Sequence, residues 1–220
     1  MDPPNTFGAF LRNPVTWILM VPLATALLVV VVLVLKGRAD NSPKLPVHRD
    51  APTFTLEDQS ARSFKSESLR GRVWIANFIF TRCEVVCPLT TAKMVKIQRQ
   101  LGPSSGTQLV SFSVDPQYDT PQRLSAYAKK FKANELNWRF LRSTRRMMKQ
   151  VVFDGFKIGM GIIGIKDDAE ADTANVKQSD MVHGEHFVLV DKQMRIRGYY
   201  ALEGEDSIAR IVRHARFLAK

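Results

Sequence analysis

The stretch "RVWIANFIFTRCEVVCPLTTAKM", residues 72–94, joins two different patterns. Its first part is apolar, β-branched and aromatic without interruption, which is typical of a strand buried on both faces of a central sheet. Its last part predicts a helix over 90–101, after a proline that favours a helix start. Cys83 and Cys87, the only cysteines of the chain, lie at the junction. The carboxyl end of a strand is where open α/β sheets place their ligands.

Strands and helices alternate along the rest of the chain. The predicted strands are 108–114, 137–141, 157–165, 186–191 and 194–202, and the predicted helices are 120–131, 143–156 and 206–220. The last two strands form a hairpin around a two-residue turn, and the acidic segment 166–180 is expected to be an exposed insertion. This order predicts an α/β protein with a thioredoxin-like fold, a central mixed sheet and a β-hairpin insertion near the C-terminal half.

An uncharged segment from Pro14 to Leu35 precedes this domain. As a helix it would rise about 33 Å, enough to cross a hydrocarbon core of about 30 Å. A cleavable signal peptide has a shorter apolar region, so we expect an uncleaved N-terminal transmembrane helix. The expected organisation is a cytoplasmic tail at 1–13, the anchor at 14–35, a stiff proline-containing linker at 36–52 and the thioredoxin-like domain at 53–220.

The chain is strongly basic, with a formal net charge of +11 from 32 Lys and Arg against 21 Asp and Glu. Such an excess favours anionic partners, which include nucleic acid, acidic lipid and an acidic protein face. The basic residues are dispersed and match no nucleic-acid-binding motif, so we expect no nucleic acid partner.

Two thiols as close as Cys83 and Cys87 can form a disulfide, a redox couple or part of a metal site. A helix N-terminus favours a thiolate, so both are expected to be more acidic than a free thiol with a pKa of about 8.5. The three residues between them place the sulfurs about one helical turn apart, where both can chelate one soft ion or form a disulfide. A chain of this length needs no disulfide to complete its core.

Four histidines could supply a further ligand. His48 lies in the linker and His214 among polar positions of the last helix, so we expect both to be solvated. His183 and His186 open the hairpin, and residues three apart on a strand point to opposite faces, so at most one of them easily joins the sulfurs. This argues against a zinc site of four ligands. Two thiolates with one imidazole suit copper, because sulfur selects Cu(I) and nitrogen helps to hold Cu(II).

Three motifs together resemble the Sco/SenC family of membrane-anchored, thioredoxin-like copper chaperones of cytochrome oxidase assembly. They are "FIFTRCEVVCPLT" at 78–90, "SFSVDPQYDTPQRLSAYAKKF" at 111–131 and "HGEHFVLVD" at 183–191. The resemblance implies that the domain at 53–220 holds copper, as Cu(I) or Cu(II), through Cys83, Cys87 and His183. It implies delivery to the dinuclear copper site of cytochrome c oxidase subunit II, or to another copper-accepting protein, or reduction of the cysteines of that site.

The resemblance also decides the topology. Arg12 precedes the anchor while Lys36, Arg38 and Lys44 follow it, so the positive-inside count alone favours a cytoplasmic domain. A protein of this family belongs on the other side, so we expect a single-pass inner-membrane protein whose domain faces the periplasm or the mitochondrial intermembrane space.

Other functions stay open at this stage. The chain is expected to be a metallochaperone rather than an enzyme, and the alternatives are a thiol-disulfide oxidoreductase, in which Cys83 attacks and Cys87 resolves, and a redox or copper sensor. Glu84 and Val85 depart from the family pattern, as does the segment 157–182. Asp115 is expected to cap the turn that it forms with Pro116, with a role beside the metal as the alternative.

Overall fold

The structure is a computed structural model, and it describes residues 14–39, 43, 45–84, 86–158, 160–162, 181–183, 186–201, 204 and 206–220. In helix α2 the side chains are described at 18 and 20–33, and in strands β7 and β8 only the backbone is described. The predicted tail at 1–13 and the predicted insertion at 166–180 lie outside the described residues. The chain divides into two compact units, Met1–Lys44 and Leu45–Lys220.

The first unit contains the helix α2 (Pro14–Ala39), with Pro22 inside it. The hydroxyl of Thr25 is satisfied within the helix, because it donates to the carbonyls of Val21 (3.0 Å) and Pro22 (2.9 Å). Its large apolar side chains are exposed wherever they are described. Among the residues that the structure describes, no helix reaches both the length and the hydropathy of a membrane span.

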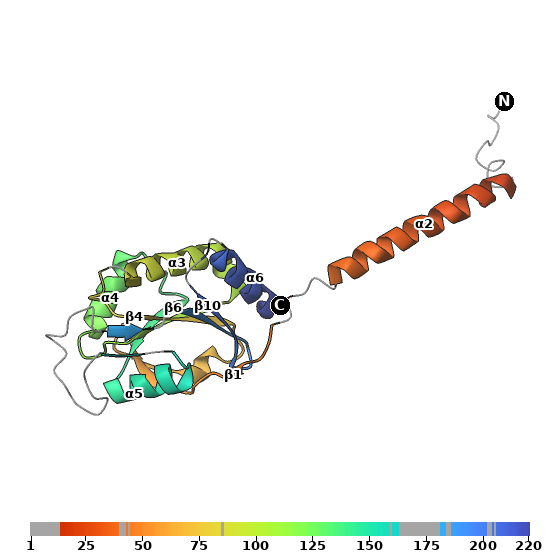
Figure 1. The fold of residues 1–220 in the computed structure, drawn as a ribbon. Coiled ribbons are helices and arrows are strands. Elements are labelled where there is room, and N and C mark those ends of the chain that lie inside the picture. The colour runs from red at the N-terminus through yellow and green to blue at the C-terminus, as the bar shows by residue number, and fades with distance from the viewer. Residues whose placement is uncertain are drawn as a thin grey trace. The chain divides into compact units, whose positions relative to one another are not determined.

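The second unit is built on an eight-stranded sheet with the order β1-β10-β9-β4-β5-β6-β2-β3 (Figure 1). Its strands are β1 (Arg49–Asp50), β2 (Thr55–Asp58), β3 (Ser63–Lys65), β4 (Trp74–Ile79), β5 (Gln108–Ser113), β6 (Trp138–Arg142), β9 (His186–Val190) and β10 (Arg195–Ala201). Strands β4, β5 and β6 pair in parallel, and the other pairs are antiparallel. The predicted α/β fold with a central mixed sheet is confirmed.

Helices cover both faces of this sheet. Figure 1 shows α3 (Val86–Leu101), α4 (Pro121–Lys130) and α6 (Ser207–Ala219) on one face and α5 (Arg145–Lys149) on the other. Helix α3 packs beside α6. Helix α5 continues into a π-helical turn, Gln150–Gly155. Helix α4 starts as predicted, because the Thr120 hydroxyl accepts a hydrogen bond from the Arg123 N–H and a proline follows the cap.

The core lies on both sides of β4, whose residues are all buried. On this strand Phe78 stacks on Phe112, with ring centroids 5.9 Å apart, and meets the edge of Phe156 at 5.5 Å. Aromatic pairs of this kind add to the free energy of burial. Every residue of the core cluster belongs to the second unit. This unit therefore has a closed core of its own and can fold independently of α2.

Four features differ from the sequence expectations or extend them. The hairpin of β9 and β10 is part of the main sheet rather than an insertion, because β9 pairs with the central strand β4. Strands β7 (Met160–Ile162) and β8 (Met181–His183) form a separate two-stranded sheet. The end of the predicted linker at 36–52 packs on the domain, since β1 pairs with β10. The hairpin of β2 and β3 was not predicted.

Candidate functional site

The cysteines lie between β4 and α3, as predicted. The strand ends at Ile79, and a turn follows in which the Cys83 N–H donates to the Phe80 carbonyl (3.2 Å). Helix α3 begins at Val86, earlier than the predicted start at residue 90, so Cys87 belongs to its first turn. The two sulfurs are therefore held by the end of a buried strand and the start of a helix.

The two side chains are free thiols, and both are buried. Cys83 is 5% exposed and Cys87 is fully buried, so Cys83 is the more accessible sulfur. The Cys87 N–H donates to Cys83 Sγ (3.2 Å), and the Phe80 N–H donates to Cys87 Sγ (3.5 Å). Each sulfur thus accepts one backbone hydrogen bond, which fixes its position relative to the helix start.

The expectation that both thiols are acidic is wrong for Cys87. A hydrogen bond with the Cys83 side chain and burial of the sulfur raise the pKa of Cys87 well above its ordinary value. The Phe80 N–H lowers this pKa, but it does not offset the other two causes. The helix terminus therefore does not decide the protonation of this thiol, because the neighbouring sulfur and the dry surroundings matter more.

A buried carboxylate, Asp119, holds the turn that precedes the cysteines. It accepts hydrogen bonds from the Thr81 N–H (3.1 Å), the Thr81 hydroxyl (2.5 Å) and the Ser113 hydroxyl (2.6 Å). Burial raises the pKa of Asp119 to about 6, although the hydrogen bonds from Ser113 and Thr81 oppose the rise. The carboxylate joins the end of β5 to the residue two positions before Cys83.

A second carboxylate, that of Asp115, also links the segment after β5 to the turn before the cysteines. Its Oδ2 lies 2.6 Å from the Nε of Arg82, the residue before Cys83, and the guanidinium of Arg82 lies 4.8 Å from the ring centroid of Tyr118. The backbone carbonyl of Asp115 accepts the N–H groups of Tyr118 (3.1 Å) and Asp119 (2.9 Å), which closes a turn. The expected turn is present, and the Asp115 carboxylate also binds Arg82.

The sequence reasoning missed Asp119 and Arg82. Asp119 could have been found from one signal, the two acidic residues in "SVDPQYDT" directly after a predicted central parallel strand. Such residues lie at the same sheet edge as the cysteines of the neighbouring strand.

His183 is described by its backbone only. It ends β8, where it is paired with Met160 of β7. His186, three residues later in the sequence, is half-buried and begins β9 opposite Ala201. Within the described side chains, no group of three His, Cys, Asp or Glu residues is arranged to hold a metal ion. Whether the imidazole of His183 meets the sulfurs stays a prediction.

The other two histidines differ from each other. His48 is exposed, as expected, with its ring 5.6 Å from that of Tyr199. His214 was expected to be solvated; it is half-buried, and its Nδ1 lies 2.6 Å from the hydroxyl of Tyr200. Burial lowers the pKa of His214, and the nearby Arg213 and Arg210 lower it further.

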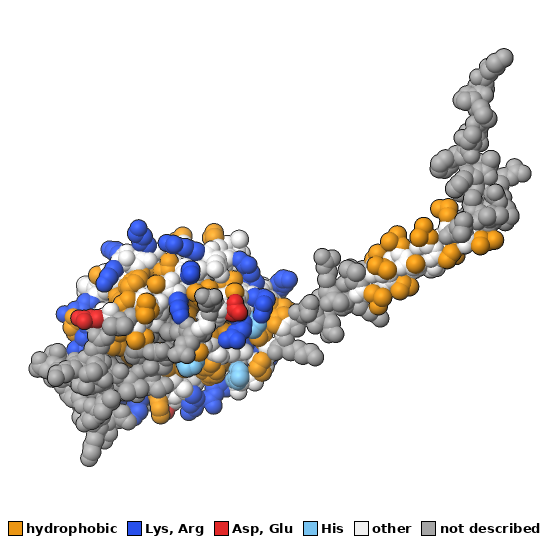
Figure 2. Space-filling view, turned by 45° about the horizontal axis from the view of Figure 1, so that its top comes forward, with side chains coloured by type: hydrophobic (Ala, Val, Ile, Leu, Met, Phe, Trp, Pro, Cys, Tyr) orange, Lys and Arg blue, Asp and Glu red, His pale blue; other side chains and the backbone are white. Residues whose placement is uncertain are grey.

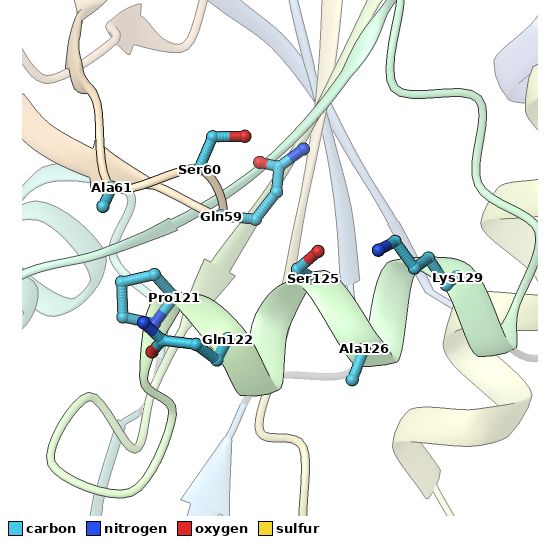
Figure 3. A pocket seen from close by; sticks show the side chains of 8 residues that line it. All are labelled: Gln59, Ser60, Ala61, Pro121, Gln122, Ser125, Ala126 and Lys129. Atoms are coloured by element: carbon cyan, nitrogen blue, oxygen red, sulfur yellow. The ribbon is translucent and has the colours of Figure 1, made fainter.

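A hollow of about 470 Å³ lies away from the thiols, between the turn after β2 and helix α4 (Figure 3). Its lining is polar or small: Gln59, Ser60, Ala61, Pro121, Gln122, Ser125, Ala126 and Lys129. The side chain of Gln59 already binds the Glu135 carboxylate (3.2 Å) and the Phe140 N–H (3.0 Å). Since neither cysteine lines it, this hollow is not part of the thiol site.

Comparison with known sequences gives a consistent picture. The family model described as SCO1/SenC matches residues 44–218. The chain is 39% identical over 99 residues to the SCO1 protein homolog of Bacillus subtilis (strain 168), which is 44% of this chain and 51% of that protein. It is 30% identical over 152 residues to an SCO2-like protein of Rickettsia prowazekii (strain Madrid E), which is 68% of each chain. The chain spans about half the length of the first curated relatives that it matches.

Solved structures share the fold. A SCO1/SenC family lipoprotein from Bacillus anthracis str. Ames is similar with a TM-score of 0.69 and 29% identity, over 80% of this chain and 99% of that chain. BsSco, described as a member of the Sco family of cytochrome c oxidase assembly proteins with a disulfide switch, has a TM-score of 0.60 and 28% identity, over 79% and 96%. The expected thioredoxin-like fold is thereby confirmed.

Proposed function

Because the chain belongs to the SCO1/SenC family, we propose that it is a membrane-anchored copper chaperone. It delivers copper to the dinuclear copper site of cytochrome c oxidase subunit II, or reduces the cysteines of that site. The observation that carries the proposal is the pair of free, buried thiols at the junction of β4 and α3. Support for the pathway comes from BsSco, which is described as belonging to a family of oxidase assembly proteins.

The donor groups fit copper. We propose Cys83, Cys87 and His183 as ligands, with two soft sulfurs that select Cu(I) and one imidazole that helps to hold Cu(II). Both sulfurs lie at the start of α3, and a backbone N–H donates to each of them. The pKa of Cys87 is raised, so this thiol is protonated at neutral pH before metal binding. Copper uptake therefore releases a proton from Cys87.

The two carboxylate ties hold the sulfur pair in place. Asp119 binds Thr81 and Asp115 binds Arg82, so both residues before Cys83 are fixed to the neighbouring strand and its turn. A site held in this way loses little conformational entropy when it binds a metal. In transfer, a thiolate of the acceptor binds the ion before a sulfur of this chain leaves, and the leaving sulfur takes up a proton.

A second function is favoured by the closeness of the two cysteines, since the Cys87 N–H donates to Cys83 Sγ (3.2 Å). In a thiol-disulfide oxidoreductase, the Cys83 thiolate attacks one sulfur of an acceptor disulfide and forms a mixed disulfide. Cys87 then passes its proton to the first acceptor thiolate, attacks Cys83 Sγ and releases the second acceptor thiolate. Two electrons pass to the acceptor, and this chain ends with a Cys83 to Cys87 disulfide.

Copper binding to the reduced domain, residues 45–220, tests the ligand set. Wild-type protein should bind one equivalent of copper per chain, and Cys83→Ala or Cys87→Ala should remove Cu(I) binding. His183→Ala should weaken Cu(II) binding, while His186→Ala, three residues away, is the matched control. Unchanged binding in Cys83→Ala or His183→Ala would remove that residue from the site.

The same variants separate the two functions. With an acceptor peptide that carries the two cysteines of the dinuclear copper site, His183→Ala should abolish copper transfer and leave reduction of the peptide disulfide largely intact. Reduction of the peptide disulfide by the wild type without copper transfer would favour the oxidoreductase.

The anchor is α2. The segment from Pro14 to Leu35 has no charge, and the large apolar side chains described in α2, from Ile18 to Leu33, are exposed. We place its N-terminus in the cytoplasm and the domain in the periplasm or the intermembrane space, against the positive-inside count. A reporter that is active only in the cytoplasm, fused after Lys220, should be silent. Activity of this reporter would reverse the topology.

A further inference from the structure

One face of the domain is covered by helices that contain no acidic residue. Within their bounds, α3, α4 and α6 hold no Asp or Glu. Their basic residues are Lys93, Lys96, Arg99, Arg123, Lys129, Lys130, Arg210, Arg213 and Arg216. We name these residues the basic helical layer. Figure 1 shows that the three helices lie on the same side of the sheet, so the charges belong to one layer of the fold.

The spacing of these residues forms stripes along the helices. Lys93, Lys96 and Arg99 are three apart along α3, and the three arginines of α6 repeat the same spacing. Residues three apart lie on one side of a helix. All members except Lys93 are exposed, and Lys93 is half-buried. Figure 2 shows Lys and Arg side chains spread over this part of the surface, with few Asp or Glu among them.

Carboxylates form ion pairs with basic residues on the strands and loops of the domain. The ion pairs of the described residues use Arg62, Arg82, Arg142, Arg195 and Arg197, all of which lie on strands or loops. Within the described part of the chain, no exposed member of the basic helical layer forms an ion pair. Among the described residues, the exposed members of the layer therefore present a positive potential to a partner.

We propose that the basic helical layer binds the anionic headgroups of a phospholipid bilayer. A stable protein interface needs apolar or aromatic anchors at its centre and is depleted of lysine. Leu89 is the only exposed large apolar residue described in these three helices. Dispersed charges without an anchor suit mobile lipid headgroups, which can rearrange beneath each cation.

The entry point of the chain favours the same partner. The guanidinium of Arg197 binds the carbonyls of Leu45 (2.5 Å) and Pro46 (3.0 Å), so the start of the domain is fixed to the hairpin of β9 and β10. The Nζ of Lys192, in the turn of that hairpin, binds the carbonyl of Ala219 at the end of α6 (2.7 Å). The chain therefore enters the domain beside one edge of the basic helical layer. An anchor ahead of Leu45 raises the effective lipid concentration at this edge.

Sedimentation with vesicles tests the proposal on the domain, residues 45–220. Vesicles of phosphatidylcholine alone are compared with vesicles of phosphatidylcholine and phosphatidylglycerol in equal parts, at about 0.05 M and about 0.5 M salt, where screening differs strongly. We expect binding only to the anionic vesicles and only at low salt. The triple variant Lys96→Gln, Arg99→Gln and Arg213→Gln should weaken binding by about tenfold or more.

The matched control is Lys65→Gln, Arg70→Gln and Arg146→Gln, which removes the same charge at exposed positions outside the layer. It should bind nearly as well as the wild type. Equal losses in both variants would show that net charge, and not this surface, attracts the lipid, and would overturn the proposal. Absence of binding to anionic vesicles at low salt would also overturn it and would leave an acidic protein as the partner. The assay needs no copper, so either result leaves the copper proposal intact.

Discussion

The two halves of the proposed copper site are built in different ways. The sulfur half, Cys83 and Cys87, follows the central buried strand β4 and begins α3. The imidazole half, His183, ends β8, which pairs only with β7 among the described strands. The sulfur half is therefore held in place by the core, whereas β8 lies outside the main sheet. Elements with few contacts to the core open at lower free energy than core strands do.

This difference suits a protein that must both hold and release a metal. A sulfur pair fixed by the core can keep its geometry through many cycles of loading and transfer. A third ligand on a separate pair of strands can leave without disturbing that core. The proposed roles of Cys83, Cys87 and His183 thus predict that changes to the two halves have different consequences for stability.

The largest expected difference concerns stability without copper. Phe78→Ala, at the centre of β4, should lower the free energy of unfolding by about 4 kcal/mol, because it leaves a cavity against Phe112 and Phe156. His183→Ala should lower it by less than about 0.5 kcal/mol. Urea unfolding of residues 45–220 measures both. A loss in His183→Ala as large as that in Phe78→Ala would show that β8 is integral to the core.

The second expected effect is a pH dependence that originates in the sulfur half. The pKa of Asp119 is raised from 3.8 to about 6, mainly by burial. Protonated Asp119 therefore makes its full contribution to the free energy of unfolding below about pH 4. This contribution is lost as the pH rises through about 6, where Asp119 ionises. Between these limits the wild type should lose up to about 3 kcal/mol relative to Asp119→Asn, which cannot ionise.

Urea unfolding at a series of pH values measures this difference. Asp191→Asn is a suitable control, because burial of Asp191 is outweighed by hydrogen bonds from Arg195 and Arg197 and its pKa is lowered. Its linkage has the opposite sign, with stability lost as the pH falls. A difference between wild type and Asp119→Asn that does not change from about pH 4 to about pH 7 would contradict the raised pKa.

The sequence was informative wherever the pattern was local. The strand before the cysteines, the cap of α4 at Thr120 and the pairing of β9 with β10 follow from hydrophobic periodicity and capping chemistry. The turn of that hairpin is longer than the predicted two residues, since β9 ends at Val190 and β10 begins at Arg195. The position of Cys83 and Cys87 at a strand end followed from the same rules. These features need only the residues of one segment and its neighbour.

Features that depend on distant residues were not predictable in this way. The last part of the linker expected at 36–52 forms strand β1, because an edge of β10, far along the chain, is free to pair with it. The high pKa of Cys87 depends on burial and on a second sulfur, and the Asp119 tie depends on the register of β5 beside β4. Periodicity carries no information on such contacts. His183 needs the same kind of information, so its role was assigned by resemblance alone.

The third effect tests the tie beside Cys83. Arg82→Ala leaves the carboxylate of Asp115 buried beside fewer positive charges and should lower the free energy of unfolding by about 2 kcal/mol. The double variant Arg82→Ala with Asp115→Asn should recover part of this loss, because the buried charge is gone. A double variant whose loss equals the sum of the single losses would show that the two side chains do not interact.

The smallest expected effect compares two helix caps with the same chemistry. Thr120 accepts from the Arg123 N–H at the start of α4, and Thr144 accepts from the Met147 N–H at the start of α5. Either Thr→Ala change should lower the free energy of unfolding by about 1 kcal/mol, and Thr→Ser should not.

Only Thr120 adjoins the turn that carries Asp119, so only Thr120→Ala should speed the reaction of Cys83 with a maleimide. Equal reaction rates in Thr120→Ala and Thr144→Ala would mean that the cap of α4 stabilises the helix without influencing the sulfur half.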